Sequence, residues 1–256
     1  MNPRGRIVFA SIARAGWLAA LILLLPGFAL SQPTPGVISS ATLTAVDRVQ
    51  LTTKLKAITG WSDLEFDNES RLRRSDRNAV GGSSAARSLL DRAISGQHII
   101  LIEDASRDRE VVFARARTAR WKSFASSGSP VFVIQIDFAD FEHVSGDQLA
   151  LQAFDVGWVV LHEVDHIVNN SLDSDRADEA GECENHINVM RRECNLPERG
   201  DYFFTFLPIA TDSVFAARFV RLAFERDFAG ARRKYWLLWD ATLVGGVHSR
   251  ELASLR

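Results

Sequence analysis

The segment 152–169 limits the fold more than any other part of the chain, because it combines an apolar helical pattern with two regularly spaced histidines. Its apolar residues recur three or four positions apart: Val160, Val164 and Ile167. His162 and His166 are four positions apart, which on a helix places both imidazoles on one face. We therefore expect a helix over this segment, with one face in the core and another face that carries the two histidines.

The segment 131–138 is almost continuously apolar, which is typical of a strand covered on both faces. We expect the apolar face of the histidine helix to pack on it. Further strands are predicted at 98–103, 110–116, 215–224 and 234–241, the first two joined as a hairpin. Further helices are predicted at 42–59, 83–94 and 179–194. These elements predict an α+β fold, in which a small mixed or antiparallel sheet packs on the histidine helix and on the helix 179–194.

The first 31 residues have the three parts of a secretory signal peptide. Basic residues come first: Arg4, Arg6 and Arg14. An uncharged, largely apolar stretch follows at 15–31, with Ala29 and Ser31 at the −3 and −1 positions of a cleavage site before Gln32. The apolar run is shorter than the ~20 residues of a membrane span, so an uncleaved anchor is the less favoured alternative. We expect a secreted or periplasmic protein.

Removal of residues 1–31 takes away three arginines and no acidic residue, which moves the formal net charge from −2 to −5. An acidic protein is a poor candidate for binding nucleic acid or an anionic membrane surface, so we expect neither partner after cleavage. The remainder divides into a linker rich in proline and serine at 32–40 and a single domain at 41–256. The sequence leaves open whether residues 32–82 cover the active-site cleft.

The two cysteines, Cys183 and Cys194, are expected to be free buried thiols. They lie eleven residues apart in one predicted helix, which separates their Cα atoms by about 16 Å. A disulfide requires a separation below about 7 Å. The stripe they form with Ile187 and Met190 favours burial in the core.

The motif His162-Glu163-x-x-His166 indicates metal-assisted hydrolysis. Two imidazoles on one helix face can hold one zinc ion, and Glu163 stands beside them to take a proton from a metal-bound water. Coordination to a metal lowers the pKa of that water from 15.7 to about 7. We therefore expect Zn²⁺ as the cofactor and Glu163 as the general base.

His-Glu-x-x-His on a helix that follows a core strand resembles the zincin metallopeptidases, over residues 131–202 of this chain. The resemblance implies a peptide or protein substrate. A looser likeness, to a small bacterial effector-protease family, depends on scattered positions: Glu184-Asn185, Arg191-Arg192-Glu193, 195–199 and Tyr202. In that family a stretch with these residue types follows the zinc helix.

The third zinc ligand is expected on the helix 179–194, as in the gluzincin branch of the zincins. The three-histidine branch is excluded, because residues 167–172 lack the histidine it requires. We predict Glu182 as the ligand, because the preceding Gly181 permits close approach of a neighbouring backbone. Glu179 and Glu184 are the alternatives, and His186 is less favoured. Glu184 is expected on a more solvated side of the helix.

Other polar residues near the motif receive simpler interpretations. Asp165 matches a deformylase pattern, but both cysteines lie downstream of the motif and a deformylase needs one upstream. Asp165 is therefore expected to be either a hydrogen-bond acceptor behind the ligands or a solvent-facing charge of the helix. The acids of the loop, Asp173, Asp175, Asp178 and Glu179, lack the spacing of a calcium loop and are read as solvated. Arg199 or Tyr202 could steady an oxyanion, although a structural role is favoured for both.

The sequence thus predicts an exported zinc metallopeptidase that cleaves a peptide or amide bond. The alternative is a noncatalytic exported domain with a structural metal or none. A structural zinc closes its fourth position with a protein ligand, for which Cys183 or His186 is the natural candidate.

Overall fold

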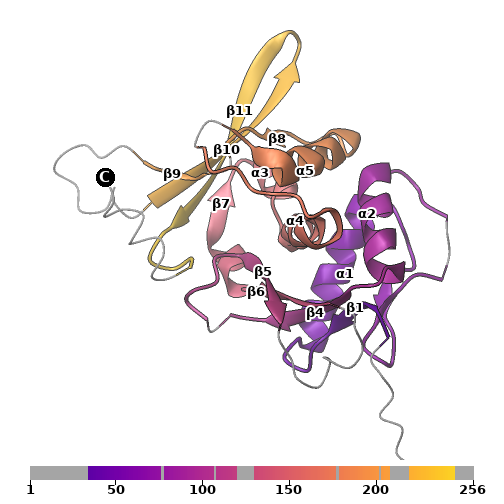
Figure 1. Ribbon diagram of the computed structural model, residues 1–256. Helices are drawn as coiled ribbons and strands as arrows, with labels where there is room; N and C mark the ends of the chain where they lie inside the picture. Colours follow the sequence, from indigo (N-terminus) through magenta and orange to yellow (C-terminus); the bar gives the residue numbers. More distant parts are fainter. Residues whose placement is uncertain are drawn as a thin grey trace, which may run out of the picture. The chain divides into compact units, whose positions relative to one another are not determined.

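Strand β6 (Val131–Ile136) is an inner strand of a four-stranded sheet, and five of its six residues are buried, as expected for a strand covered on both faces. In the computed structural model, the strand order is β1 (Gly36–Ser39), β4 (Ile99–Asp104), β6 and β5 (Ala114–Ala119). The first three strands are parallel, and β5 runs antiparallel at the edge (Figure 1). The predicted hairpin of β4 and β5 is therefore wrong: the two strands pair with opposite edges of β6 and not with each other.

The structure describes residues 34–75, 78–106, 108–119, 130–176, 179–201, 203–207 and 219–245. The signal peptide expected at 1–31 and the side chain of Tyr202 lie outside these residues. Within them, no helix combines the length and the apolar content needed to cross a membrane. The described residues all belong to one compact unit.

The linker expected at 32–40 is wrong for residues 36–39, which form β1 and pair in parallel with β4. Val37 is buried, and Arg71 fastens the preceding residues by donating from Nη1 to the carbonyl oxygen of Thr34 at 2.9 Å. The proline and serine content of this segment is typical of a linker, and the partner strand β4 lies about sixty residues away in the chain. No local pattern therefore indicates the strand. Residues 36–39 are thus an integral part of the first sheet.

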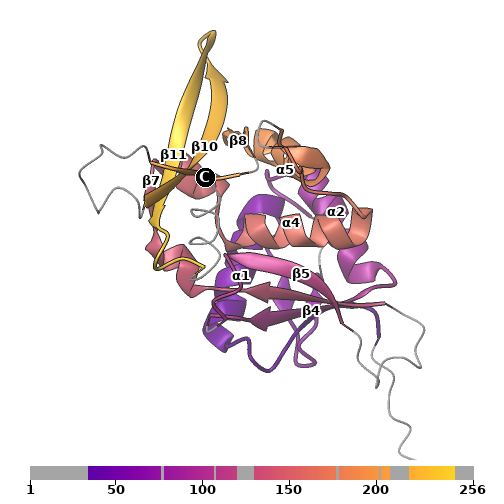
Figure 2. The same ribbon diagram turned by 60° about the vertical axis from the view of Figure 1, so that its left-hand side comes forward.

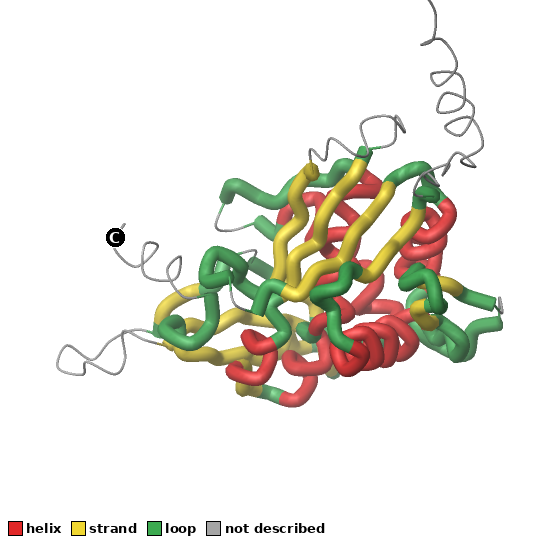
Figure 3. Tube along the Cα trace, turned by 90° about the horizontal axis from the view of Figure 1, so that it is seen from below, coloured by secondary structure: helices red, strands yellow, loops and turns green. Residues whose placement is uncertain are grey.

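Two helices begin and end where the sequence indicates. Helix α1 (Ala45–Thr59) starts with a capping box between Thr44 and Asp47, and it ends at Gly60, whose φ of 73° suits glycine. Helix α2 (Ser84–Ser95) is capped by Ser83. Both helices pack with the sheet in one hydrophobic cluster, and Figure 3 shows helices behind its strands.

Helix α4 (Val156–Asn169) carries the histidine motif and lies alongside β5 (Figure 2). It is shorter than predicted, because the first residues of the predicted helix belong to a separate short helix, α3 (Gln148–Ala153). Asp155 is the N-cap of α4: its carboxylate accepts hydrogen bonds from the Gly157 and Trp158 N–H groups at 2.9 and 3.3 Å. The following helix, α5 (Gly181–Glu193), contains Cys183, and Cys194 comes directly after it. Both cysteines are free, as predicted; Cys183 is fully buried, whereas Cys194 is only partly buried, so the predicted burial is correct for Cys183 alone.

The C-terminal strands build a second sheet instead of extending the first. Its order is β7 (Val144–Gly146), β11 (Ala231–Asp240), β10 (Phe219–Phe228) and β8 (Glu198–Arg199), with β9 (Thr205–Phe206) also pairing with β10. All of its pairs are antiparallel. A short pair, β2 (Glu65–Phe66) with β3 (Leu72–Arg73), and a 3₁₀ helix (Ala139–His143) complete the described elements. The fold is α+β, as predicted, with a mixed and an antiparallel sheet where one sheet was expected.

Candidate metal centre

Helix α4 brings its two histidines together as the four-residue spacing predicts. The Nε2 atoms of His162 and His166 lie 3.1 Å apart, and the ring planes are nearly perpendicular. Zinc–nitrogen bonds are about 2.0–2.1 Å long, so two nitrogens at this separation can bind the same ion. The two Nε2 atoms thus face one point beside the helix, at which a single ion could be bound.

Asp173 faces that same point from the loop between α4 and α5. Its Oδ1 lies 3.1 Å from His162 Nε2, and its Oδ2 lies 3.3 Å from His166 Nε2. The predicted third ligand, Glu182, is exposed on the first turn of α5 and is not a member of the donor cluster. The structure therefore places Asp173, and not Glu182, beside the two histidines. The Asp173 side chain is 33% exposed, in agreement with its interpretation as a solvated loop acid.

The loop that carries Asp173 is fixed by backbone contacts to the start of α5. Asp173 forms an isolated antiparallel bridge with Gly181, and the N–H group of Cys183 donates to the Leu172 carbonyl oxygen at 3.2 Å. Gly181 has a φ of 82°, and a Cβ atom there would stand 2.4 Å from the Ser174 nitrogen. The close approach expected at Gly181 is thus confirmed, but it brings in the loop rather than Glu182.

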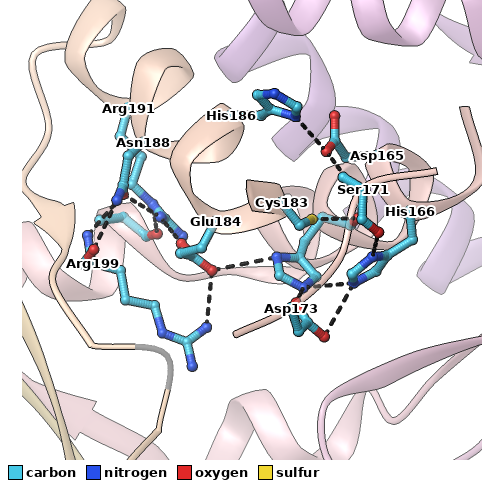
Figure 4. A network of polar contacts seen from close by, with 12 residues as sticks. Asp165, His166, Ser171, Asp173, Cys183, Glu184, His186, Asn188, Arg191 and Arg199 are labelled. Atoms are coloured by element: carbon cyan, nitrogen blue, oxygen red, sulfur yellow. Dashed lines mark hydrogen bonds and ion pairs between the residues drawn. The ribbon is translucent and has the colours of Figure 1, made fainter. Parts of the chain in front are cut away.

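Each histidine is oriented by a hydrogen bond at its other ring nitrogen. His162 Nδ1 lies 3.3 Å from Oε2 of Glu184, and His166 Nδ1 lies 2.9 Å from the carbonyl oxygen of Ser171. Both partners are acceptors, so Nδ1 carries the proton in each neutral ring and Nε2 keeps its lone pair. Metal-binding histidines are commonly held in this way. Figure 4 shows His166 in contact with Ser171 through one ring nitrogen and with Asp173 through the other.

Glu184 is almost fully buried and forms ion pairs with two arginines. Its Oε1 pairs with Nη1 of Arg191, and its Oε2 lies 3.2 Å from Nη1 of Arg199. Burial alone would raise the pKa of Glu184, but the two guanidinium groups and His162 hold it well below its usual range. The side of α5 read as solvated is therefore buried, and Glu184 stays ionised behind His162.

A second buried acid supports the other histidine. Asp165 is fully buried, and its Oδ2 accepts a hydrogen bond from the Ser171 hydroxyl at 2.6 Å. The same oxygen lies 2.8 Å from Nδ1 of His186. Asp165 thus holds the residue whose carbonyl oxygen orients His166, in agreement with its expected place behind the ligands. His186 is engaged there and is not a member of the donor cluster.

Glu163, the expected general base, is buried against the edge strand of the first sheet. Its Oε2 accepts a hydrogen bond from the Ala116 N–H group of β5 at 2.7 Å. Burial raises the pKa of Glu163, while the neighbouring His162 and His166 oppose the rise. A carboxylate in such surroundings accepts a proton more readily than one in water, which suits a general base.

The thiol of Cys183 completes the donor cluster. One ligand atom from each of four residues lies within 4.8 Å of the others: His162, His166, Asp173 and Cys183. The thiol also donates to the His162 carbonyl oxygen at 3.3 Å. Imidazole, carboxylate and thiolate donors in a compact group fit zinc better than calcium or magnesium, which prefer oxygen ligands only. Sequence reasoning missed Asp173, although its distance of seven residues from His166 and the glycine at 181 were available as signals.

A cavity of about 270 Å³ opens beside the centre. His162, Glu163 and Arg199 contribute its polar wall, together with Glu184 and Arg191. Its remaining lining is apolar or aromatic: Val112, Phe113, Ala114, Phe154, Trp158, Val159, Phe203, Phe204, Leu222 and Trp239. A molecule in this cavity would thus touch one of the histidines and the candidate base.

Comparison of the chain with protein-family models, with curated proteins and with solved structures finds no match. No relative therefore assigns a role to any residue of the centre, and the chemistry depends on the donor set, the buried carboxylates and the cavity.

Proposed function

We propose that this protein is a zinc-dependent hydrolase of peptide or amide bonds, an exported metallopeptidase. One observation carries the proposal: the buried Glu163 carboxylate stands next to a centre of two oriented imidazoles and a carboxylate, at the wall of a cavity. A purely structural site has no need of a buried acid that is not a ligand. His162, His166 and Asp173 would hold the ion.

Glu163 would act as the proton carrier of the reaction. A bound zinc would supply acidity to a water molecule and polarise the scissile carbonyl group. Glu163 then takes a proton from water and delivers it to the leaving nitrogen, so the carboxylate returns to its starting state. Its hydrogen bond from Ala116 fixes one oxygen, which keeps the carboxyl group in a single orientation during both transfers.

A peptide is the substrate that the surroundings suit best. Strand β5 is the edge of its sheet, and the N–H group of Ala116 points to α4 rather than to β6. An extended peptide can pair with such an edge through main-chain hydrogen bonds. The aromatic cavity beside the same residues would accommodate one side chain of that peptide.

Export is part of the proposal. The basic residues, the apolar stretch and the small residues at Ala29 and Ser31 favour cleavage after Ser31. Amino-terminal sequencing of the protein recovered from the producing cell should begin at Gln32. A mature protein that begins at Met1 would contradict this proposal and leave the hydrolase proposal to its own test.

One observation favours a second function, a noncatalytic domain with a structural zinc. Cys183 lies within the same 4.8 Å group as the other donors. If its thiolate occupies the fourth position, the site is closed and no water can be activated. The contact of the thiol with the His162 carbonyl oxygen gives the sulfur another partner, which favours the open site.

The deciding experiment pairs two glutamate substitutions. Glu163→Gln should keep about one zinc per chain, measured by elemental mass spectrometry, and lose at least about a hundredfold in peptide hydrolysis, because the proton acceptor is removed. Glu182→Gln makes the same chemical change at an exposed position and should leave both quantities unaltered. Hydrolysis retained in Glu163→Gln would falsify the catalytic role.

A further inference from the structure

The wall of the cavity contains a strained turn centred on Phe113. This residue has a φ of 61°, a left-handed conformation that is unusual for a bulky side chain. The Ala114 N–H group donates to the Val112 carbonyl oxygen at 2.7 Å, so residues 112–114 form a γ-turn, and all three line the cavity. A γ-turn with a positive φ at its centre is rare and strained, and it persists only where its surroundings enforce it.

The backbone of Phe113 is held on both sides by residues around the start of the 3₁₀ helix. Oδ2 of Asp140 accepts a hydrogen bond from the Phe113 N–H group at 2.8 Å. The Phe113 carbonyl oxygen accepts a hydrogen bond from the Asp137 N–H group at 2.9 Å. Both backbone polar groups of the strained residue are therefore engaged within the chain, which fixes the turn in one conformation.

The second oxygen of the Asp140 carboxylate binds a third segment. Oδ1 accepts a hydrogen bond from the Gly245 N–H group at 3.2 Å, and a Cβ atom at Gly245 would stand 2.3 Å from the side chain of Val112. Asp140 is 2% exposed. Burial raises the pKa of Asp140 to about 6, while the N–H groups of Phe113 and Gly245 oppose the rise. One buried carboxylate thus joins the turn to the segment that follows β11.

The turn lies where the cavity meets the edge strand of the first sheet. Ala114 begins β5, and Ala116, two residues later, donates the hydrogen bond that fixes Glu163. The Phe113 ring stands edge-on to Trp239 of β11, with ring centroids 5.4 Å apart. None of the turn residues, and neither residue that clamps the turn, belongs to the donor cluster of the metal centre. A change in the turn would therefore alter the cavity without removing a ligand.

We propose that Phe113 shapes the subsite for the substrate side chain next to the cleaved bond, and that Asp140 is the positioning residue that holds Phe113 in the strained turn. The subsite then has its shape before the substrate arrives, so binding does not have to order the wall. This inference rests on the proposed function for the meaning of the subsite, but its test measures binding and does not need hydrolysis.

The test measures binding of N-acetylphenylalaninamide to the zinc-loaded Glu163→Gln protein. The apolar side chain of this probe suits the lining of the cavity. At about pH 8 Asp140 is ionised, because this pH lies above the pKa of about 6. Asp140→Ala in the same background should keep the zinc and weaken probe binding about tenfold, because the Phe113 N–H group loses its acceptor and the turn relaxes. In a nitrogen–proton correlation spectrum of the parent protein, the probe should shift the amide signals of residues 112–114.

Asp67→Ala is the matched control. The Asp67 carboxylate also accepts two backbone hydrogen bonds, from the Glu69 and Arg71 N–H groups, both at 2.9 Å, in a loop outside the cavity lining. Its loss should lower the melting temperature and leave probe affinity unaltered. A merely structural Asp140 would give this same result, so unaltered affinity in Asp140→Ala would overturn the proposal.

Two further outcomes would also overturn the proposal: no binding of the probe to the parent protein, or an equal loss of affinity in Asp140→Ala and Asp67→Ala. If Asp140→Ala does not fold, the amide signals of the parent protein decide, and probe binding that leaves residues 112–114 unshifted contradicts the assignment. Absence of hydrolysis in the unsubstituted protein, with an intact dependence of probe binding on Asp140, would count against the enzyme and not against the subsite.

Discussion

Oε2 of Glu184 lies 3.3 Å from Nδ1 of His162, and the same buried carboxylate pairs with Arg191 and Arg199. The contact joins α5 to the ligand face of α4. Because Glu184 remains ionised, it holds the proton of His162 on Nδ1 and leaves Nε2 for the metal. Glu184 is thus a positioning residue of the centre, although the sequence suggested it only as an alternative ligand.

We predict that Glu184→Gln weakens zinc binding by about 10- to 100-fold, because an amide orients the imidazole less strongly than a carboxylate. The change also leaves Arg191 buried without its counter-charge, so the melting temperature should fall. Zinc affinity can be measured by competition with a chelator. Glu182→Gln serves as the control, and equal zinc affinity in the two variants would contradict the assignment.

Asp173 rather than Glu182 should control metal content. Asp173→Ala removes the carboxylate that faces both Nε2 atoms, so the purified variant should hold well under one zinc per chain after dialysis. Glu182→Ala should retain the metal content of the unsubstituted protein. Elemental analysis of the two variants prepared side by side checks this prediction, and a reversal of the two results would restore the third ligand inferred from the sequence.

Zinc affinity should rise with pH. In the metal-free protein, burial lowers the pKa of His166, but Asp173, Cys183 and the Ser171 carbonyl oxygen outweigh it and raise the pKa to about 11. Protons therefore occupy the site at neutral pH and must leave before zinc can bind. Affinity should increase about tenfold per pH unit for each proton displaced. Calorimetry in buffers of different ionisation enthalpy measures the protons released; zinc uptake without proton release would be the contrary result.

Gly181→Ala should disturb the centre through the backbone. A Cβ atom at this position would clash with the Ser174 nitrogen, and the φ of 82° is unfavourable for alanine. We expect a loss of about 1–3 kcal/mol in unfolding free energy and a weaker zinc affinity, because the Asp173 loop is displaced. Gly230→Ala has a similar φ of 78° with nothing within 4 Å, so it should lose stability but keep zinc affinity.

The sequence predicted the parts of the centre that depend on local spacing. His162, Glu163 and His166 belong to one helix, and a single helical turn fixes their relation. Asp173 lies in a loop whose path is set by contacts with Gly181 and Cys183, which no short-range pattern encodes. Glu182 on the following helix was therefore chosen by analogy with the gluzincin branch, whereas the structure places Asp173 next to the histidines.

The fold shows the same division between local and distant information. Helices α1 and α2 carry their caps in the adjacent sequence, and both were predicted within three residues of their observed bounds. Strand β1 pairs with β4, which is distant in the chain, and β4 and β5 each pair with β6 rather than with one another. The burial of Glu184 likewise depends on its ion pairs with Arg191 and Arg199, which the folded chain brings to it (Figure 4).

The central claim is an open, catalytic zinc centre, and anomalous X-ray diffraction at the zinc absorption edge tests it most directly. The claim predicts one zinc peak within about 2.0–2.2 Å of Nε2 of His162, Nε2 of His166 and a carboxylate oxygen of Asp173. It also predicts a fourth position filled by solvent on the side of Glu163. A peak bonded to the Cys183 sulfur at about 2.3 Å, with all four positions filled by protein, would contradict the claim and establish a structural site.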